Sequence, residues 1–337
     1  MTTVKRLVTI GVPIYKRLQY LPHILGLVQA QDYPAIELIV SDNGENGTAV
    51  RDLVQQHYSR PYRFRQNPAT VPISAHFNQL VQEASGEFFA LLADDDEISS
   101  NYASGLVRQF ERYPDASVGI ARQEILSEEG IVIRKSAEEL PHTLSGPDFI
   151  RAVWPRNDFK FECFSTFLAR TEQVRSMGGY PNFARGNHIE NALLIKLILN
   201  NSVVLSSDCV FRWRVDPRSY GWSVSIRDLA AACREFLRFL RQDSVIQDFA
   251  ARHPDSWRPL HDGLVQMAWR TYLWRWKSLY QEGLPRLRWW KAAFALPPIK
   301  DYYREVAVVL IQDVKSRTKR LVLGQRPPER AANWFKG

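Results

Sequence analysis

The chain has 337 residues, of which 45% are hydrophobic and 24% are charged, values ordinary for a globular protein that buries a core. No run of residues approaches the ~20 apolar positions that a membrane-crossing helix needs, which excludes a spanning segment. The net charge of +8 is carried by residues 286–337, which hold twelve Lys or Arg against four Asp or Glu.

Strand and helix patterns alternate through the first hundred residues. Buried strands are rich in β-branched residues and end at Gly or Pro, whereas the helices place apolar residues three and four apart. Such alternation predicts a mostly parallel sheet with helices on both faces. Expected strands span residues 6–12, 36–42, 62–67 and 87–93, and expected helices span 20–31, 48–58 and 73–86.

The strand at 87–93 runs directly into four carboxylates, Asp94, Asp95, Asp96 and Glu97. Ligands of parallel α/β sheets bind beyond the carboxyl ends of the strands, so this acidic run is expected at a binding edge. Crowded carboxylates are stabilised by a cation, and Mg²⁺ or Mn²⁺ commonly sits between carboxylates and the phosphates of a nucleotide. The alternative is a solvated acidic loop.

Two longer stretches carry a resemblance to a known family. "VTIGVPIYKRLQYLPHILGLVQAQDYPAIELIVSDNGENG" (8–47) and "NPATVPISAHFNQLVQEASGEFFALLADDD" (67–96) resemble the conserved blocks of family 2 glycosyltransferases. The resemblance extends over roughly residues 5–215 and implies the GT-A fold, a Rossmann-like, mostly parallel α/β sheet flanked by helices. It also implies an enzyme that uses a nucleotide-diphospho-sugar donor.

The resemblance implies a set of donor-binding residues. Tyr15 matches the aromatic position beside the nucleotide base, Asp42 the acceptor of a hydrogen bond from the base, and Asn43 a second, more variable position. Arg17 matches a basic position that meets ribose or phosphate. Taken singly, such residues have ordinary structural roles as turn formers or loop caps. The implied donor-binding residues are Pro13, Tyr15, Arg17, Asp42, Asn43, Asn78 and Asp94.

The acidic run departs from the usual family motif, and two alignments remain open. Without gaps, Ala93 takes the first Asp position, Asp95 becomes the ligand of a divalent metal (Mn²⁺ or Mg²⁺), and Asp96 follows it. With a shift of one residue, Asp94 and Asp96 form the pair. We favour Asp95 as the direct ligand, with Asp94 directed toward the ribose and Asp96 close by.

The family is generally inverting, and its catalytic base lies at the start of a helix after a Gly-Gly-aromatic block. The segment "MGGYPNFARGNHIENALLIKLILNN" (177–201) resembles that region and places Glu190 at the base position. Asn191 follows where many members carry a second acid, and an amide cannot take up a proton. The alternative role for Glu190 is a carboxylate that stabilises a helix N-terminus, and His188 is the nearest rival base.

After an expected strand at 202–207, the segment "FRWRVDPRSYGWS" (211–223) resembles the part of the family fold that closes over the donor. Asp216 fills the position of a family histidine. It is therefore either a further metal or phosphate-binding residue or only a turn former.

From about residue 212 the pattern becomes helical, with amphipathic stretches at 226–240, 264–281 and 303–323. We therefore expect a catalytic domain at 1–215 and a helical C-terminal region at 216–337. Basic residues alternate with aromatic ones within 286–337, which favours association with an anionic membrane surface. Packing in a helical subdomain or a homo-oligomer interface is the alternative, and no motif indicates nucleic-acid binding.

The sequence predicts a metal-dependent, inverting glycosyltransferase that acts on a glycan or polyprenyl-linked glycan acceptor in surface polysaccharide biosynthesis. A cytoplasmic protein is expected, with the inner membrane face as a second location. One alternative is a non-catalytic protein of the same fold that binds glycans or membrane surfaces. A sugar nucleotidyltransferase is disfavoured because "GVPIYKRLQYL" (11–21) lacks a Gly-rich phosphate loop.

Overall fold

The computed structural model describes residues 6–154, 156–216, 219 and 224–281. The expected helix at 303–323 and the basic, aromatic segment 286–337 lie outside the described residues. Their roles stay predictions.

The first seven elements match the strands and helices expected from the sequence, with small differences at their ends. Each follows from its residue pattern: β1 is buried at every position, and α1 buries the stripe formed by Leu21, Ile24, Leu25 and Val28. These elements are β1 (Val8–Ile14), α1 (Leu21–Gln29), β2 (Ile36–Asp42), α2 (Ala49–His57), β3 (Tyr62–Gln66), α3 (Ile73–Glu83) and β4 (Phe88–Leu91).

The later elements include one strand that is longer than expected. Beyond an irregularity between Ser206 and Val210, β10 resumes pairing with β6 and continues to Arg214. The elements are β5 (Glu97–Ile98), α4 (Tyr102–Arg112), β6 (Ala116–Leu126), β7 (Val132–Lys135), β8 (Thr143–Ser145), α5 (Gly146–Val153), β9 (Leu168–Arg170), α6 (Thr171–Ser176), η1 (Ala184–Gly186), α7 (Ile189–Ile198), β10 (Ser202–Arg214), α8 (Ile226–Gln242), α9 (Ser244–Arg252) and α10 (Pro254–Gln281).

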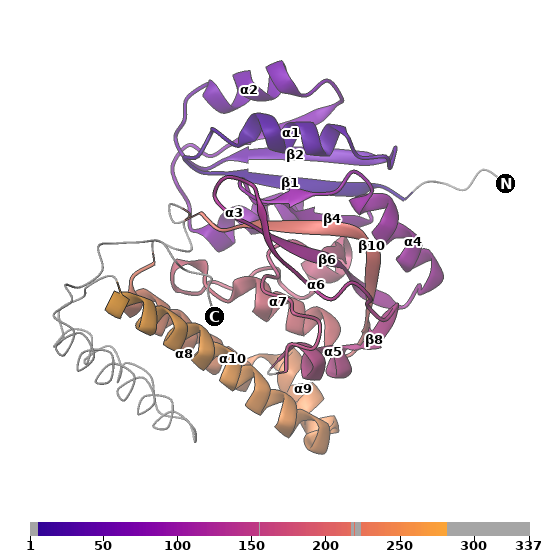
Figure 1. Ribbon diagram of the computed structural model, residues 1–337, viewed down its shortest axis with the longest axis vertical. Coiled ribbons are helices and arrows are strands. Elements are labelled where there is room, and N and C mark those ends of the chain that lie inside the picture. The colour runs from indigo at the N-terminus through magenta and orange to yellow at the C-terminus, as the bar shows by residue number, and fades with distance from the viewer. Residues whose placement is uncertain (1–5, 155, 217–218, 220–223, 282–337) are drawn as a thin grey trace, which may run out of the picture.

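The strands form one ten-stranded sheet with the main order β3-β2-β1-β4-β9-β6-β10-β5. Strands β5 and β9 run against the other strands of this path, so the sheet is mostly parallel, as predicted. Because β1, β2 and β4 are parallel neighbours, their carboxyl ends lie at one edge (Figure 1). The loops that follow them, which hold the predicted donor and metal residues, therefore meet there.

Helices cover both faces of the sheet, which confirms the predicted α/β architecture. One buried cluster joins the sheet to α1, α2 and α4, and a second joins its other face to α3, α5 and α7. The second cluster continues into α8, α9 and α10 through buried residues such as Phe236, Leu240 and Leu264. Figure 1 shows α8 and α10 on the outer side of α5 and α7. A domain boundary at 215/216 remains a proposal, and among the described residues no helix is long and apolar enough to cross a membrane.

Candidate active site

A cavity of about 960 Å³ opens at the carboxyl edge of the sheet. Its walls come from the loops after β1, β2 and β4, from the loop before α7 and from the first turn of α7. Nine residues that the sequence singled out line this one space, although they come from positions far apart in the chain. They are Pro13, Tyr15, Arg17, Asn43, Asp94, Asp95, Asp96, His188 and Glu190.

Asp42 lies behind the cavity wall and is fully buried. Its Oδ1 accepts hydrogen bonds from the backbone N–H of Gly44 and from Nδ2 of Asn46, both at 2.8 Å. Its Oδ2 is buried without a hydrogen-bond partner among the described residues. A buried acceptor of this kind is costly unless something donates to it.

The loops after β1 and β2 approach each other closely at a glycine. A Cβ atom on Gly44 would lie 1.3 Å from the carbonyl oxygen of Tyr15, so no other residue fits there without moving a loop. The backbone N–H of Asn43 also donates to the carbonyl oxygen of Ile14 at 2.8 Å. These contacts fix Tyr15 and Asn43 side by side at the cavity rim.

Asn78 does not reach the cavity. Its Oδ1 accepts a hydrogen bond from the backbone N–H of Tyr180 at 2.8 Å, and its Nδ2 donates to the carbonyl oxygen of Tyr180 at 2.9 Å. The side chain therefore ties α3 to the segment that leads to Glu190. This placement indicates a positioning contact and gives no support to direct donor binding.

The guanidinium of Arg17 lies beside the acidic cluster, which is formed by Asp94, Asp95 and Asp96. Nη1 of Arg17 donates to Oδ2 of Asp95 at 2.6 Å, and Nη2 donates to Oδ1 of Asp94. Oδ2 of Asp216 is 3.8 Å from the same Nη1 and accepts a hydrogen bond from the Tyr20 hydroxyl at 3.1 Å. Asp216 is fully buried and is not among the residues that line the cavity, although it lies near Arg17.

The carboxylates of the cluster still repel one another although Arg17 lies beside them. Burial raises the pKa of Asp94 to about 7; the nearby Arg17 opposes the shift and the neighbouring Asp95 adds to it. Burial lowers the pKa of Arg17, but its hydrogen bond to Asp95 and the surrounding carboxylates outweigh this effect and raise it. An additional positive charge would therefore stabilise the ionised form of the cluster.

Asp96 is held by the protein on both oxygens. Oδ2 accepts from the hydroxyl of Ser165 at 3.0 Å, and Oδ1 accepts from the backbone N–H of Arg214 at 3.2 Å. Burial, together with the charge of Asp95, raises the pKa of Asp96 well above its ordinary value. Asp96 is thus a less accessible ligand than Asp94 or Asp95.

Within the described ranges, no three histidine, cysteine or acidic side chains are grouped so that they hold an ion by themselves. Mg²⁺, however, is commonly held by one or two carboxylates together with substrate phosphates. Asp94 and Asp95 line the cavity and share one guanidinium between two carboxylates, so this oxygen donor set fits a hard divalent cation.

Glu190 is the second residue of α7, which follows a loop of unusual backbone conformation. Arg185, Gly186 and His188 all have positive φ, at 53°, 69° and 67°. The chain thereby turns sharply and places Glu190 half-buried in the cavity wall. Burial raises the pKa of the Glu190 carboxyl to about 7. A carboxylate with a pKa near the working pH is suited to proton transfer.

His188, the alternative base, is held by contacts with Cys233, Asn191 and Phe236. Its Nε2 lies 3.4 Å from the Cys233 sulfur, its Nδ1 lies 3.4 Å from Nδ2 of Asn191, and its ring is 5.2 Å from that of Phe236. Burial lowers the pKa of His188 to about 4, so the ring is neutral near pH 7. These contacts join α7 to α8 and favour a structural role.

Other cavity residues escaped the sequence analysis. Ser165 and Cys163 lie in an irregular segment without a motif. His76 lies in α3, at a position to which the family resemblance assigns no role. His76 contacts the Ser41 hydroxyl through Nε2 at 2.9 Å, and burial lowers its pKa to about 4. Only the fold brings these three residues to the same cavity.

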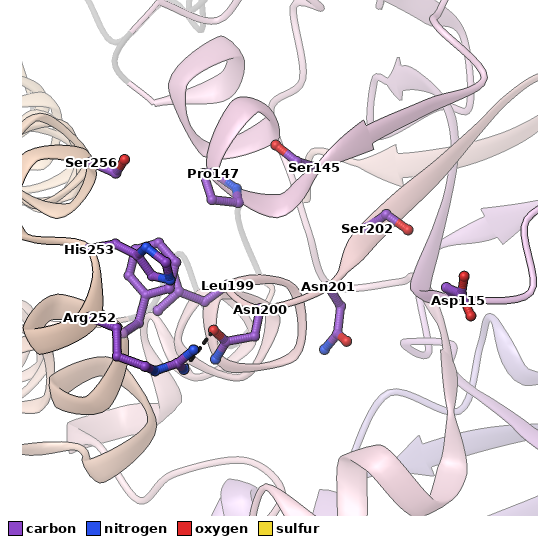
Figure 2. Close-up of a pocket in the computed structure, with 11 residues that line it drawn as sticks. Asp115, Ser145, Pro147, Leu199, Asn200, Asn201, Ser202, Arg252, His253 and Ser256 are labelled. Carbon is purple, nitrogen blue, oxygen red and sulfur yellow. Dashed lines mark hydrogen bonds between the residues drawn. The ribbon is translucent and has the colours of Figure 1, made fainter.

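A second cavity of about 830 Å³ (Figure 2) lies near the amino ends of β6 and β10, and its lining includes none of Asp94, Asp95 and Asp96. It is lined by Ser202, Asn200 and Arg252 among others, and the Arg252 guanidinium donates to Oδ1 of Asn200. It contains none of the predicted site residues.

Comparison with known proteins identifies the family. The family model described as "Glycosyl transferase family 2" matches residues 9–178, half of the chain. The chain belongs to glycosyltransferase family 2. The matched region contains the sheet edge, the acidic cluster and Asn78, and ends before the loop that carries Glu190.

A curated relative in Campylobacter jejuni is named GalNAc(5)-diNAcBac-PP-undecaprenol beta-1,3-glucosyltransferase. It is 32% identical over 101 residues, which cover 29% of this chain and 32% of the relative, so the match spans about a third of that protein's length.

Two solved structures establish the likeness of fold. Residues 1–349 of TarS from S. aureus, in complex with UDP-GlcNAc, match with a TM-score of 0.55 at 16% identity and cover 73% of this chain and 72% of that one. The mannosyltransferase PcManGT from Pyrobaculum calidifontis, in complex with GDP-Man and Mn²⁺, matches with a TM-score of 0.51 at 16% identity, covering 92% and 88%.

Proposed function

We propose that this family 2 member is a metal-dependent, inverting glycosyltransferase. It moves a sugar from a nucleotide-diphospho-sugar to a hydroxyl of a glycan or polyprenyl-linked glycan. The observation that carries the proposal is one cavity lined both by the carboxyl of Glu190, from the first turn of α7, and by the carboxylates of Asp94 and Asp95. One group suits an acceptor proton and the other two suit a charged donor.

The loops after β1 and β2 bind the nucleotide. The ring of Tyr15 is 38% exposed at the cavity rim, which leaves a face for stacking on a base. Oδ2 of Asp42 accepts a hydrogen bond from the base after a small opening of the wall. The UDP-GlcNAc and GDP-Man complexes of the two structural neighbours support a nucleotide-sugar as the donor.

Asp95, with Asp94 beside it, would hold Mn²⁺ or Mg²⁺ together with the donor's diphosphate. When bound, the ion neutralises charge that develops on the departing diphosphate. Asp96 and Asp216 would help to hold the cluster in place, since both are buried and hydrogen-bonded to the protein. The Mn²⁺ in the mannosyltransferase neighbour supports this cofactor.

Glu190 acts on the acceptor. Its carboxylate accepts the proton of the attacking hydroxyl as that oxygen bonds to the anomeric carbon, and the nucleoside diphosphate leaves from the opposite face. A single displacement of this kind inverts the anomeric configuration. The raised pKa keeps Glu190 basic enough to take up the proton near neutral pH.

For the acceptor, we propose only its chemical class. The name of the Campylobacter relative specifies a glycan on undecaprenyl diphosphate, which supports a lipid-linked acceptor here. An acceptor of that kind lies at a membrane surface, and the basic, aromatic segment 286–337 supplies the charge to reach it. We therefore propose a cytoplasmic protein that works at the inner membrane face.

Incubating the full chain with a panel of UDP- and GDP-sugars and Mn²⁺, followed by mass spectrometry, tests the proposal. Wild-type protein should release nucleoside diphosphate from one donor. Glu190→Gln should bind that donor with similar affinity and release none. Binding without release in the wild type, across the panel and with glycan acceptors, would instead favour a non-catalytic glycan-binding protein.

A further inference from the structure

We propose that Arg17 is a tethered cation that competes with the divalent ion for Asp94 and Asp95. In the free protein its guanidinium holds the two carboxylates together, and it leaves them for the donor's diphosphate when ion and donor bind. The second half of this inference rests on the proposed function, because it needs a diphosphate. The competition with the ion does not.

Arg17 and a bound ion would compete for the same two carboxylates. One guanidinium spans two carboxylates, with Nη1 2.6 Å from Oδ2 of Asp95 and Nη2 on Oδ1 of Asp94. Mg²⁺ binds carboxylate oxygens at about 2.0–2.1 Å, so an ion on Oδ2 of Asp95 or Oδ1 of Asp94 would have to displace these nitrogens. Two cations on the same oxygens also repel each other strongly in a partly buried site.

Arg17 is free to move in a way that the other arginine at the cluster is not. It lies on the irregular segment between β1 and α1, its side chain is 21% exposed, and its hydrogen bonds within the described part of the chain go only to Asp94 and Asp95. Arg214, in contrast, belongs to β10, is 8% exposed, and donates to Glu97 and to the backbone oxygen of Asp95. Withdrawing Arg17 therefore breaks no strand pairing.

The exchange couples the two ligands. An ion that binds alone must displace Arg17 and take away two of its anions, Asp94 and Asp95. Of its partners in the described part of the chain, only Asp216, 3.8 Å from Nη1, then remains. A nucleoside diphosphate supplies a replacement anion, and a guanidinium matches phosphate oxygens well. Each ligand therefore lowers the cost of binding the other, and the coupling is reciprocal.

Titration of Mn²⁺ alone, followed by electron paramagnetic resonance of the free ion, tests the competition. Arg17→Ala should bind Mn²⁺ about tenfold more tightly than the wild type, a change usual for coupled sites. Arg17→Lys should fall between the two, because one ammonium cannot span both carboxylates. Arg252→Ala is the matched control: Arg252 is ion-paired with Asp248 beside the second cavity (Figure 2) and its loss should change nothing.

Unchanged or weaker Mn²⁺ binding in Arg17→Ala overturns the proposal. If that variant does not fold by circular dichroism, Arg17→Gln removes the charge at similar length, and its Mn²⁺ affinity decides in the same way.

A second titration in saturating UDP or GDP, corrected for Mn²⁺ bound to nucleotide in solution, measures the coupling. The nucleotide should raise the Mn²⁺ affinity of the wild type by a larger factor than that of Arg17→Ala. An equal factor in both proteins refutes the transfer of Arg17 to the diphosphate. If the wild type binds neither nucleotide, the proposed function fails, while the titration with Mn²⁺ alone still decides the competition.

Discussion

Replacing Glu190 by glutamine should stabilise the protein above neutral pH while it abolishes turnover. Burial raises the pKa of this carboxyl from 4.5 to about 7, and each pKa unit corresponds to about 1.4 kcal/mol. The ionised carboxylate therefore costs the folded state ~3 kcal/mol at most, less what the N-terminus of α7 returns to a negative charge. Because the folded pKa is the raised one, this cost is absent below the unfolded pKa, grows as the pH rises toward 7, and is constant above it.

Urea unfolding of the wild type and Glu190→Gln at about pH 5 and about pH 8 measures the effect. The variant should exceed the wild type by less than ~1 kcal/mol near pH 5 and by ~2–3 kcal/mol near pH 8. Turnover should fall by about 10²–10⁴, the usual contribution of a general base. Glu172→Gln, which removes an 82% exposed carboxylate on α6, is the control and should keep full turnover. A stability difference that does not change with pH would contradict the raised pKa of Glu190, and retained turnover would contradict its role as the catalytic base.

Three further changes test the site and its support. Gly44→Ala places a methyl group 1.3 Å from the Tyr15 carbonyl oxygen and must therefore move one of the two loops. Nucleotide affinity should fall at least ~10-fold, and normal affinity by calorimetry would contradict the close approach of the loops after β1 and β2. Asp95→Asn removes the favoured ion ligand and should weaken Mn²⁺ binding about tenfold or more, whereas unaltered binding would move that role to a neighbour. Phe236→Ala opens a cavity beside His188 in the shared core and should lower the free energy of unfolding by about 3–5 kcal/mol, measured by urea; a loss below ~1 kcal/mol would show that α8 packs loosely.

The strands and helices of the first hundred residues followed from sequence because their local signals agree. β1 is apolar at almost every position, as a strand buried on both faces requires, and α3 repeats Phe77, Leu80 and Val81 on one face. The acidic run was placed correctly for the same reason, since the end of β4 fixes where Asp94 must emerge. The family of the chain was also identified correctly from these blocks.

Contacts between distant segments did not follow from sequence. Tyr20 and Asp216 are 196 positions apart, and Ser165 and Asp96 are 69 apart, yet both pairs are hydrogen-bonded. The sequence around Tyr20 or Ser165 does not indicate which carboxylate its hydroxyl will contact, because the pairing depends on how the loops pack on the sheet. The partnership of Arg17 with the carboxylates was missed in the same way.

Asn78 separates what family resemblance implies from what the structure supports. The resemblance implies donor binding, whereas both polar atoms of its side chain are used by the backbone of Tyr180. Asn78→Ala would leave that buried N–H and carbonyl without partners, at a cost of about 1–3 kcal/mol. The segment from Tyr180 to Glu190 is then expected to shift.

Loss of this contact should act on the base more than on the donor. We expect Asn78→Ala to lower kcat by at least ~10-fold, since small misplacements of a catalytic group are costly, while nucleotide affinity stays within about twofold of the wild type. Kinetics and calorimetry on the same preparation separate the two effects. A large loss of nucleotide affinity with little change in kcat would restore Asn78 to the donor site. Because Gly179 has φ of 69° and a Cβ there would lie 2.2 Å from Oδ1 of Asn78, the glycine and the asparagine form one close contact, and Gly179→Ala should repeat the pattern of Asn78→Ala if the contact positions Glu190.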